Sequence, residues 1–217
     1  MSMVEMTQYY KYPRTYHVEW SPGLQSDDKR QEDYSVLQNS PSGIIVSIKM
    51  DGENTNMYSD KIHARSIDSK DHPSRHYVKG LWGGMRHLIP SGWRICGENV
   101  YAKHSIHYED LESYFYVFNI WDDTNTCLDY GTTLEVCKEL GLVHVPVIYE
   151  GKWDEQLLRE LPNKPEMKEH EGYVVRTYGS FHYDDFNKNV VKYVRKNHVQ
   201  TDQHWMFEQV VPNKLKC

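Results

Sequence analysis

The residues best suited to chemistry lie in the run Lys49-Met50-Asp51-Gly52-Glu53-Asn54. Lys49 ends an apolar, β-rich stretch and is followed, after Met50, by a carboxylate and a glycine. A lysine attacks phosphorus only as the neutral amine, so such a site has to favour that form through partial desolvation or nearby positive charge. Asp51 can orient reacting groups, and Gly52 lets the backbone approach a ligand closely. The run alone remains ambiguous, because Asp-Gly is also common in hairpin turns.

Further segments carry the groups that phosphoryl transfer needs, namely cationic side chains, a carboxylate for a metal ion and an aromatic face for a base. Taken singly, each has an ordinary structural explanation, such as a core aromatic, a turn or a surface arginine. The segments are Ile-His-Ala-Arg-Ser at 62–66, Ile-Cys-Gly-Glu-Asn at 95–99, Tyr-Phe-Tyr-Val-Phe-Asn-Ile-Trp at 114–121, Glu-Gly-Tyr-Val-Val-Arg at 171–176 and Val-Val-Lys-Tyr-Val-Arg at 190–195.

Taken in order, these segments resemble the motifs of the covalent nucleotidyltransferase superfamily of ligases and capping enzymes. The resemblance covers roughly residues 44–198 and is greatest to ATP-dependent RNA ligases of the phage and bacterial type, through Asn54 and the F-Y-x-F pattern at 115–118. It implies an enzyme that uses ATP and Mg²⁺ or Mn²⁺ to form lysyl-AMP. The AMP is then transferred to an RNA 5′-phosphate, which is sealed to a 3′-hydroxyl.

The resemblance also implies a role for individual residues. The lysine of the first motif becomes lysyl-AMP, and the others bind nucleotide, RNA or metal. We expect Lys49 as the nucleophile, Glu98 on the ribose, Phe118 on adenine, Lys192 on the α-phosphate, Asn54 and Arg65 on phosphate or the RNA end, Asp51 as a further nucleotide-binding residue, and Glu171 at the metal.

The last motif departs from the family pattern. Related ligases have two basic residues that lie two positions apart, whereas here Val194 occupies the second place and Arg195 follows it. In a regular strand Arg195 would point to the face opposite Lys192 unless a bulge redirects it. The identity of the second basic contact is therefore open.

Composition limits the kind of protein. The chain has 217 residues, 39% hydrophobic and 26% charged, which suits one globular domain spanning 1–217. The net charge of −6 restricts any nucleic-acid site to a local patch, for example the basic stretch Lys188, Lys192, Arg195, Lys196 and His198. No apolar run could span a membrane and the four cysteines are widely spaced, so we expect free thiols and a cytoplasmic protein. Asp202, His204 and Trp205 form a polar and aromatic patch that is more simply explained by packing.

Local patterns predict strands at 44–49, 54–58, 93–98, 114–121, 143–149, 171–177 and 190–194, and helices at 73–89, 132–140 and 154–161. The first forty residues look like loops with one short helix. The irregular order of elements predicts an α+β fold with mainly antiparallel sheets. In the terms of the resemblance, this is an ATP-grasp-like nucleotidyltransferase domain flanked by helices.

Few residues follow the last motif, so we expect no appended oligonucleotide-binding barrel and a possible dependence on a partner protein for RNA affinity. Two alternatives stay open. One is another covalent nucleotidyltransferase, either a DNA ligase or a capping-type guanylyltransferase. The other is a catalytically silent nucleotide- or RNA-binding module.

Overall fold

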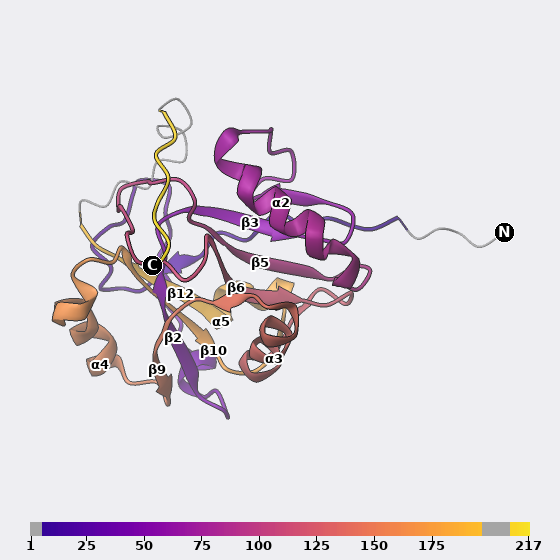
Figure 1. Ribbon diagram of the computed structural model, residues 1–217. Coiled ribbons are helices and arrows are strands. Elements are labelled where there is room, and N and C mark those ends of the chain that lie inside the picture. The colour runs from indigo at the N-terminus through magenta and orange to yellow at the C-terminus, as the bar shows by residue number, and fades with distance from the viewer. Residues whose placement is uncertain (1–5, 197–208) are drawn as a thin grey trace.

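The computed structural model describes residues 6–196 and 209–217 and contains two packed β-sheets (Figure 1). The first sheet has the order β1 (Tyr16–His17), β12 (Val190–Val194), β10 (Gly172–Thr177), β2 (Ile44–Lys49) and β9 (Val147–Gly151). The second has the order β11 (Phe181–His182), β7 (Thr126–Cys127), β6 (Phe115–Trp121), β5 (Arg94–Asn99), β3 (Glu53–Met57) and β4 (Ile62–Ala64), with β8 (Val143–His144) beside β6. Most pairings are antiparallel; β1 with β12 and β6 with β8 are parallel.

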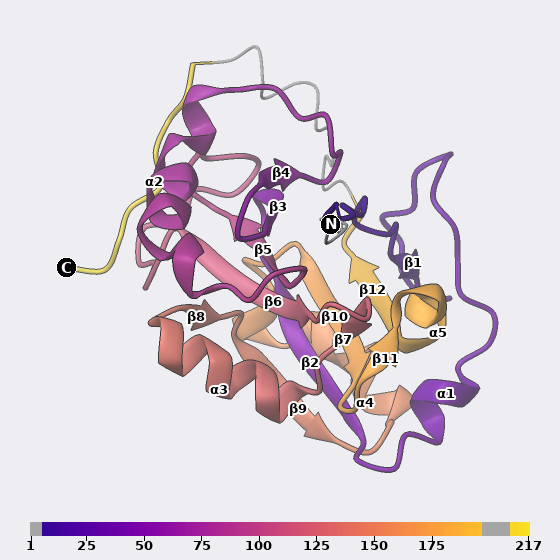
Figure 2. The same ribbon diagram turned by 90° about the vertical axis from the view of Figure 1, so that its right-hand side faces the viewer.

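Helices cover the outer faces of both sheets (Figure 2). α2 (His76–Met85) and α3 (Tyr130–Leu140) pack on β3, β5 and β6, while α1 (Ser35–Gln38) and α4 (Glu155–Glu160) pack on β2, β10 and β12. The fifth helix, α5 (Phe186–Asn189), leads directly into β12. Short 3₁₀ segments extend or link these helices: η1 (Pro73–Arg75), η2 (Arg86–Leu88), η3 (Leu161–Asn163), η4 (Pro165–Met167) and η5 (Tyr183–Asp185).

Strand alternation decides which side chains face the space between the sheets. In β12, Val191 and Tyr193 belong to the outer core, whereas Lys192 lines a cavity on the opposite face. In β10, Tyr173 and Val175 point outward in the same way. Successive side chains of a strand point to opposite faces, so each strand contributes both to an outer core and to the inner surface.

The mixed fold with mainly antiparallel sheets is as predicted, and most predicted elements are present. The helix expected at 73–89 is three consecutive segments, η1, α2 and η2. α3 begins where the Asp129 side chain accepts a hydrogen bond from the Thr132 amide, and it ends at Gly141 in the left-handed region, φ 66°. A glycine at that point ends the helix without steric strain, as the sequence indicates.

The single strand predicted at 143–149 is wrong. The chain forms β8 and β9 there, and these belong to different sheets. Pro146 lies between them and lacks the amide hydrogen that a continuous ladder needs, while its carbonyl accepts a hydrogen bond from Ile48 at 2.9 Å. The proline therefore transfers the chain from one sheet to the other.

The N-terminal segment contains the expected short helix, α1, and also β1, which no pattern predicted. All four cysteines are free, as expected. No helix in the described part of the chain is long and apolar enough to cross a membrane. The single-domain organisation and the absence of an oligonucleotide-binding barrel stay predictions.

Candidate nucleotide-binding site

A cavity of about 460 Å³ lies between the two sheets. Its volume is within the range typical of small-molecule sites. The structure brings all eight predicted site residues to its wall. Five lie in strands β2, β3, β5, β6 and β12, and the other three lie just beyond the ends of β2, β4 and β10. The residues are Lys49, Asp51, Asn54, Arg65, Glu98, Phe118, Glu171 and Lys192.

Lys49 lies at the end of β2, where its Nζ donates a hydrogen bond to Glu171 Oε1 at 2.6 Å. The lysine side chain is 22% exposed and the glutamate 2%. Burial lowers the pKa of Lys49, but the charges of Glu171, Glu98 and Asp51 outweigh it, so the pKa is raised above its ordinary value. The protein's own residues therefore favour the charged amine, and the expectation that nearby positive charge such as a metal ion favours the neutral form stays a prediction.

Glu98 belongs to β5 and lies opposite Asn54 in the β3 register. Its Oε1 accepts a hydrogen bond from the Gly52 amide at 3.1 Å. Burial raises the pKa of Glu98 to about 8; Lys49 opposes this rise, and the nearby carboxylates of Glu171 and Asp51 add to it. Three carboxyl groups, those of Glu98, Glu171 and Asp51, are therefore crowded around the Lys49 amine.

Asp51 holds the loop that follows β5. Its Oδ2 accepts a hydrogen bond from the Ile106 amide at 2.7 Å, and its own amide donates to the Tyr108 hydroxyl at 2.9 Å. The same loop contributes His104 and Ser105 to the cavity wall. Asp51 thus shapes the site as well as adding negative charge to it.

Gly52 lines the cavity, but a protein contact explains why a glycine is required there. A Cβ at this position would collide with the carbonyl oxygen of Asn99. The close approach of backbone is therefore to β5, and an approach of the same backbone to a ligand stays a prediction.

Phe118 is the single partly exposed residue of β6, whose other six residues are buried. Its ring lines the cavity and meets Tyr12 edge to face, with centroids 5.3 Å apart. It also packs against the buried clusters between the sheets. The side chain therefore has both a cavity face and a core face.

The remaining predicted residues form the other walls. Asn54 Oδ1 accepts a hydrogen bond from Asn56 Nδ2 at 2.7 Å, and Arg65 Nε donates to the Tyr12 carbonyl at 3.5 Å. Lys192 is 9% exposed, and its pKa is lowered to about 8 by burial and then by the charge of Lys49.

Arg195 does not reach the cavity. Its guanidinium donates hydrogen bonds to the carbonyls of Pro162, Met167 and His170, at 2.8, 2.6 and 3.0 Å. It therefore closes the turn that precedes β10, and the strand carries it away from Lys192 as regular alternation predicts.

The basic stretch near the C-terminus is not one continuous surface. Lys192 faces the cavity, whereas Lys188 is exposed and lies 3.8 Å from Asp185. His198 and the patch of Asp202, His204 and Trp205 lie outside the described residues.

Sequence reasoning missed the N-terminal arm, whose Tyr12, Arg14 and Thr15 line the cavity. Tyr12 is anchored where its hydroxyl accepts a hydrogen bond from Asn119 Nδ2 at 2.7 Å. The run of tyrosines with an arginine at residues 9–16 was the available signal, but it shows no period that could place it.

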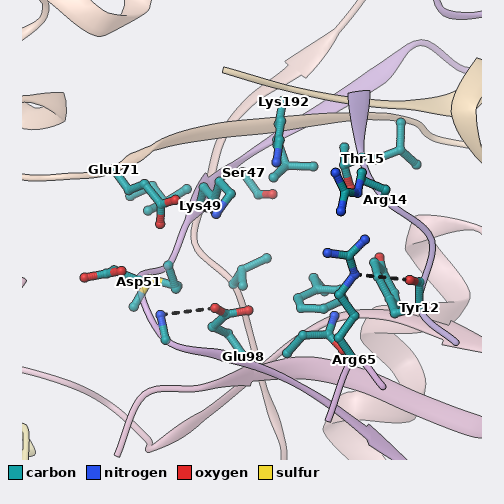
Figure 3. Close-up of a pocket in the computed structure, with 18 of the residues that line it drawn as sticks. Tyr12, Arg14, Thr15, Ser47, Lys49, Asp51, Arg65, Glu98, Glu171 and Lys192 are labelled. Atoms are coloured by element: carbon teal, nitrogen blue, oxygen red, sulfur yellow. Dashed lines mark hydrogen bonds and ion pairs between the residues drawn. The ribbon is translucent and has the colours of Figure 1, made fainter. Parts of the chain in front are cut away.

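The carboxylates and the arginines that line the cavity lie at opposite ends of it (Figure 3). Asp51, Glu98 and Glu171 lie around Lys49, whereas Arg14 and Arg65 lie at the other end and point toward one another. The described residues contain no group of three or more side chains arranged to hold a metal ion by themselves. Mg²⁺ usually takes one or two protein carboxylates together with phosphate oxygens, so the crowded carboxylates beside Lys49 fit such a cation.

Comparison with known proteins identifies first the fold and then the family. Among the solved structures that share the fold is an archaeal ATP-dependent RNA ligase, with a TM-score of 0.57 and 16% identity over 86% of this chain and 48% of that one. A mutant of the Naegleria gruberi RNA ligase with ATP and Mn has a TM-score of 0.50 and 18% identity over 75% of this chain and 52% of that one. A putative ATP-dependent DNA ligase from Aquifex aeolicus has a TM-score of 0.54 and 18% identity over 86% of this chain and 50% of that one. The chain thus spans about half the length of these ligases.

The family follows from the sequence itself. Residues 43–194 match the model of the RNA ligase family, and the chain belongs to that family. No curated protein sequence matches it significantly.

Proposed function

We propose that this protein is an ATP-dependent RNA ligase that carries AMP on Lys49. The observation that carries the proposal is the position of Lys49 at a strand end inside a closed set of complementary groups. Carboxylates lie on one side of it, cations on the other, and the partly exposed ring of Phe118 lines the same cavity. These groups suit a reaction that depends on positioning and charge neutralisation.

In this proposal Lys49 Nζ attacks the α-phosphorus of ATP, forms a phosphoramidate and releases pyrophosphate. AMP then passes to the 5′-phosphate of an RNA strand, and a 3′-hydroxyl displaces AMP to form the phosphodiester. Lys192 neutralises charge on the α-phosphate, Glu98 binds the ribose and Phe118 stacks on adenine. Asn54 and Arg65 contact phosphate or the RNA end, and Asp51 maintains the loop beside the nucleotide.

Glu171, with one of the neighbouring carboxylates, would hold Mg²⁺ or Mn²⁺. The cation would neutralise charge on the phosphates and lower the pKa of Lys49. The chain's own contribution is to keep Lys49 in place: the ion pair with Glu171 fixes the amine at the cavity wall until that carboxylate takes another partner.

An RNA-joining assay tests the substrate. A nicked duplex with a 5′-phosphorylated RNA strand should be sealed with ATP, and the same duplex with DNA strands should be a poorer substrate. Sealing of DNA alone would favour the DNA ligase alternative. A protein that binds ATP without forming an adduct or joining either strand would be the silent module.

The net charge of −6 supports a partner protein that adds RNA affinity, because an excess of negative charge on the chain opposes the binding of a long strand of phosphates. Four free cysteines, three of them buried, agree with a cytoplasmic location.

A further inference from the structure

Three cationic side chains from separate parts of the chain line the cavity in addition to Lys49. Lys192 comes from β12, Arg65 follows β4, and Arg14 comes from the N-terminal arm. Arg65 contributes to lowering the pKa of Lys192, and it also acts on Asp27, the carboxylate that Arg14 holds. The side chains of Arg14 and Arg65 point toward one another in the cavity (Figure 3), so both can contact a common ligand.

β12 and the residue after it provide one cationic side chain to the cavity, that of Lys192, so a second cationic contact has to come from another segment. Arg195 is engaged with three backbone carbonyls, and Val194, two positions after Lys192, is fully buried. Neither side chain reaches the cavity.

The arm is fixed in a position that can supply this contact. β1 pairs in parallel with β12, so that Tyr16 lies opposite Val191 and His17 opposite Lys192. Before β1, Tyr12 is held by Asn119. Arg14 lies between these two attachments, which keep its backbone beside the cavity.

Arg14 is bound to an anionic side chain of the same protein, that of Asp27. Its Nη1 donates to Asp27 Oδ2 at 2.7 Å and to the Asp27 carbonyl at 2.8 Å. The two side chains are 43% and 65% exposed, and ion pairs so open to water contribute little to stability. A phosphate, which a guanidinium binds in a bidentate manner, can replace such a carboxylate.

We propose that Arg14 is a substrate-binding residue of this site, and that Arg14 and Arg65 together bind a phosphate group in exchange for Asp27. The inference rests on the proposed function for the identity of the substrate. The phosphate belongs either to the β,γ end of ATP or to the 5′ end of RNA. Arg14 replaces the basic residue that the last motif lacks.

The experiment compares Arg14→Ala, Arg14→Lys and the control Arg159→Ala, which removes an arginine of equal side-chain exposure, 43%, on α4. One arm measures lysyl-AMP formation against ATP concentration. The other measures AMP transfer from the purified lysyl-AMP protein to 5′-phosphorylated RNA. In Arg14→Ala, lysyl-AMP formation at low ATP concentration or AMP transfer to RNA, or both, should be about tenfold or more weaker, as expected for loss of a charge-assisted contact. Arg159→Ala should match the wild type in both assays.

Arg14→Lys should recover part of the loss, because a lysine keeps the charge but not the bidentate geometry. A defect confined to the first arm assigns the phosphate to ATP, and one confined to the second assigns it to RNA. Asp27→Asn should bind substrate as well as the wild type or better. The inference is overturned if Arg14→Ala behaves like Arg159→Ala in both arms, or if Asp27→Asn is as defective as Arg14→Ala.

A binding measurement separates this inference from the proposed function. Pyrophosphate binding by calorimetry should be weaker in Arg14→Ala than in Arg159→Ala, whether or not the wild type forms an AMP adduct. A wild type that forms no adduct but binds pyrophosphate through Arg14 would contradict the proposed function and support the anion site. Equal pyrophosphate affinity in both variants, together with unchanged AMP transfer to RNA, would contradict the anion site alone.

Discussion

Lys49 and Glu171 form an ion pair of 2.6 Å across neighbouring strands, and Gly172, the residue after Glu171, lies directly opposite Lys49 in the β2–β10 register. A Cβ at Gly172 would collide with the carbonyl oxygen of Tyr193 in β12. The glutamate and glycine of this motif therefore act together: the glycine permits close packing of three strands, and the packing sets the carboxylate beside the amine.

Glu171→Ala should reduce the rate of lysyl-AMP formation at saturating ATP, because the metal ion that neutralises the charge developing on the transferring phosphate would lose a ligand. Glu171→Asp should keep part of the rate and require more Mg²⁺. The measurement is single-turnover adenylylation across a Mg²⁺ titration. Identical curves for Glu171→Ala and the wild type would show that Glu171 is only structural.

Glu98→Gln should stabilise the ligand-free protein at alkaline pH. The folded-state pKa of Glu98 is raised from 4.5 to about 8, so the native protein retains a proton that the unfolded chain releases as pH rises between these values. The stability of the wild type therefore falls as pH rises through this window. Glu98→Gln has no titrating group at this position, so its stability does not fall for this reason. We expect a gain of about 1–3 kcal/mol above pH 8, discounted for partial solvent access, and almost none at pH 4.5.

Thermal unfolding at both pH values measures this difference. Glu160→Gln, on the exposed end of α4, is the control. A gain from Glu98→Gln that is the same at both pH values would show that the carboxyl group is not under strain in the native protein.

Phe118→Ala should raise the ATP requirement for adenylylation about tenfold, since base–aromatic stacking contributes roughly 1–3 kcal/mol. It should also lower stability by about 1–3 kcal/mol, because one face of the ring packs in the core. Phe115→Ala, at a fully buried position of the same strand, should cost about 3–5 kcal/mol without changing the ATP requirement of the folded fraction. Unchanged ATP dependence in Phe118→Ala would assign Phe118 to the core.

Arg195→Ala should destabilise the fold by about 2–3 kcal/mol, because three backbone carbonyls lose a charged donor. Its folded fraction should keep the wild-type ATP requirement, whereas Lys192→Ala should not. Melting curves and adenylylation at varied ATP test both statements. An increased ATP requirement in Arg195→Ala with normal stability would contradict the structural role.

Local sequence was sufficient to predict the strands that hold the site, because β2, β5, β6, β10 and β12 are apolar runs with clear ends. It could not predict β1, a strand of two residues that forms only because β12 lies beside it. Pro146 indicates that the strand at 143–149 is interrupted, but nothing in the local sequence indicates that its two halves belong to different sheets.

The residues that form the site could be predicted from the sequence, but the combined effect of their charges on the pKa of Lys49 could not. Each predicted residue reaches the cavity. The raised pKa of Lys49 depends on carboxylates from three separate segments, and their combined effect exceeds that of burial only in the folded arrangement. Arg14 was missed for a similar reason, since its position depends on contacts with β12 and Asn119 that lie far away in the sequence.

The central claim is that Lys49 carries AMP, and intact-protein mass spectrometry after incubation with ATP and Mg²⁺ tests it most directly. The wild type should gain the mass of one AMP, in an adduct that is labile to acid and stable to alkali, as a phosphoramidate is. Lys49→Ala should gain nothing, and neither should Lys49→Arg, because a guanidinium stays protonated. Peptide mapping should place the adduct on Lys49. An adduct that persists in Lys49→Ala, or that maps to Lys192, would contradict the account.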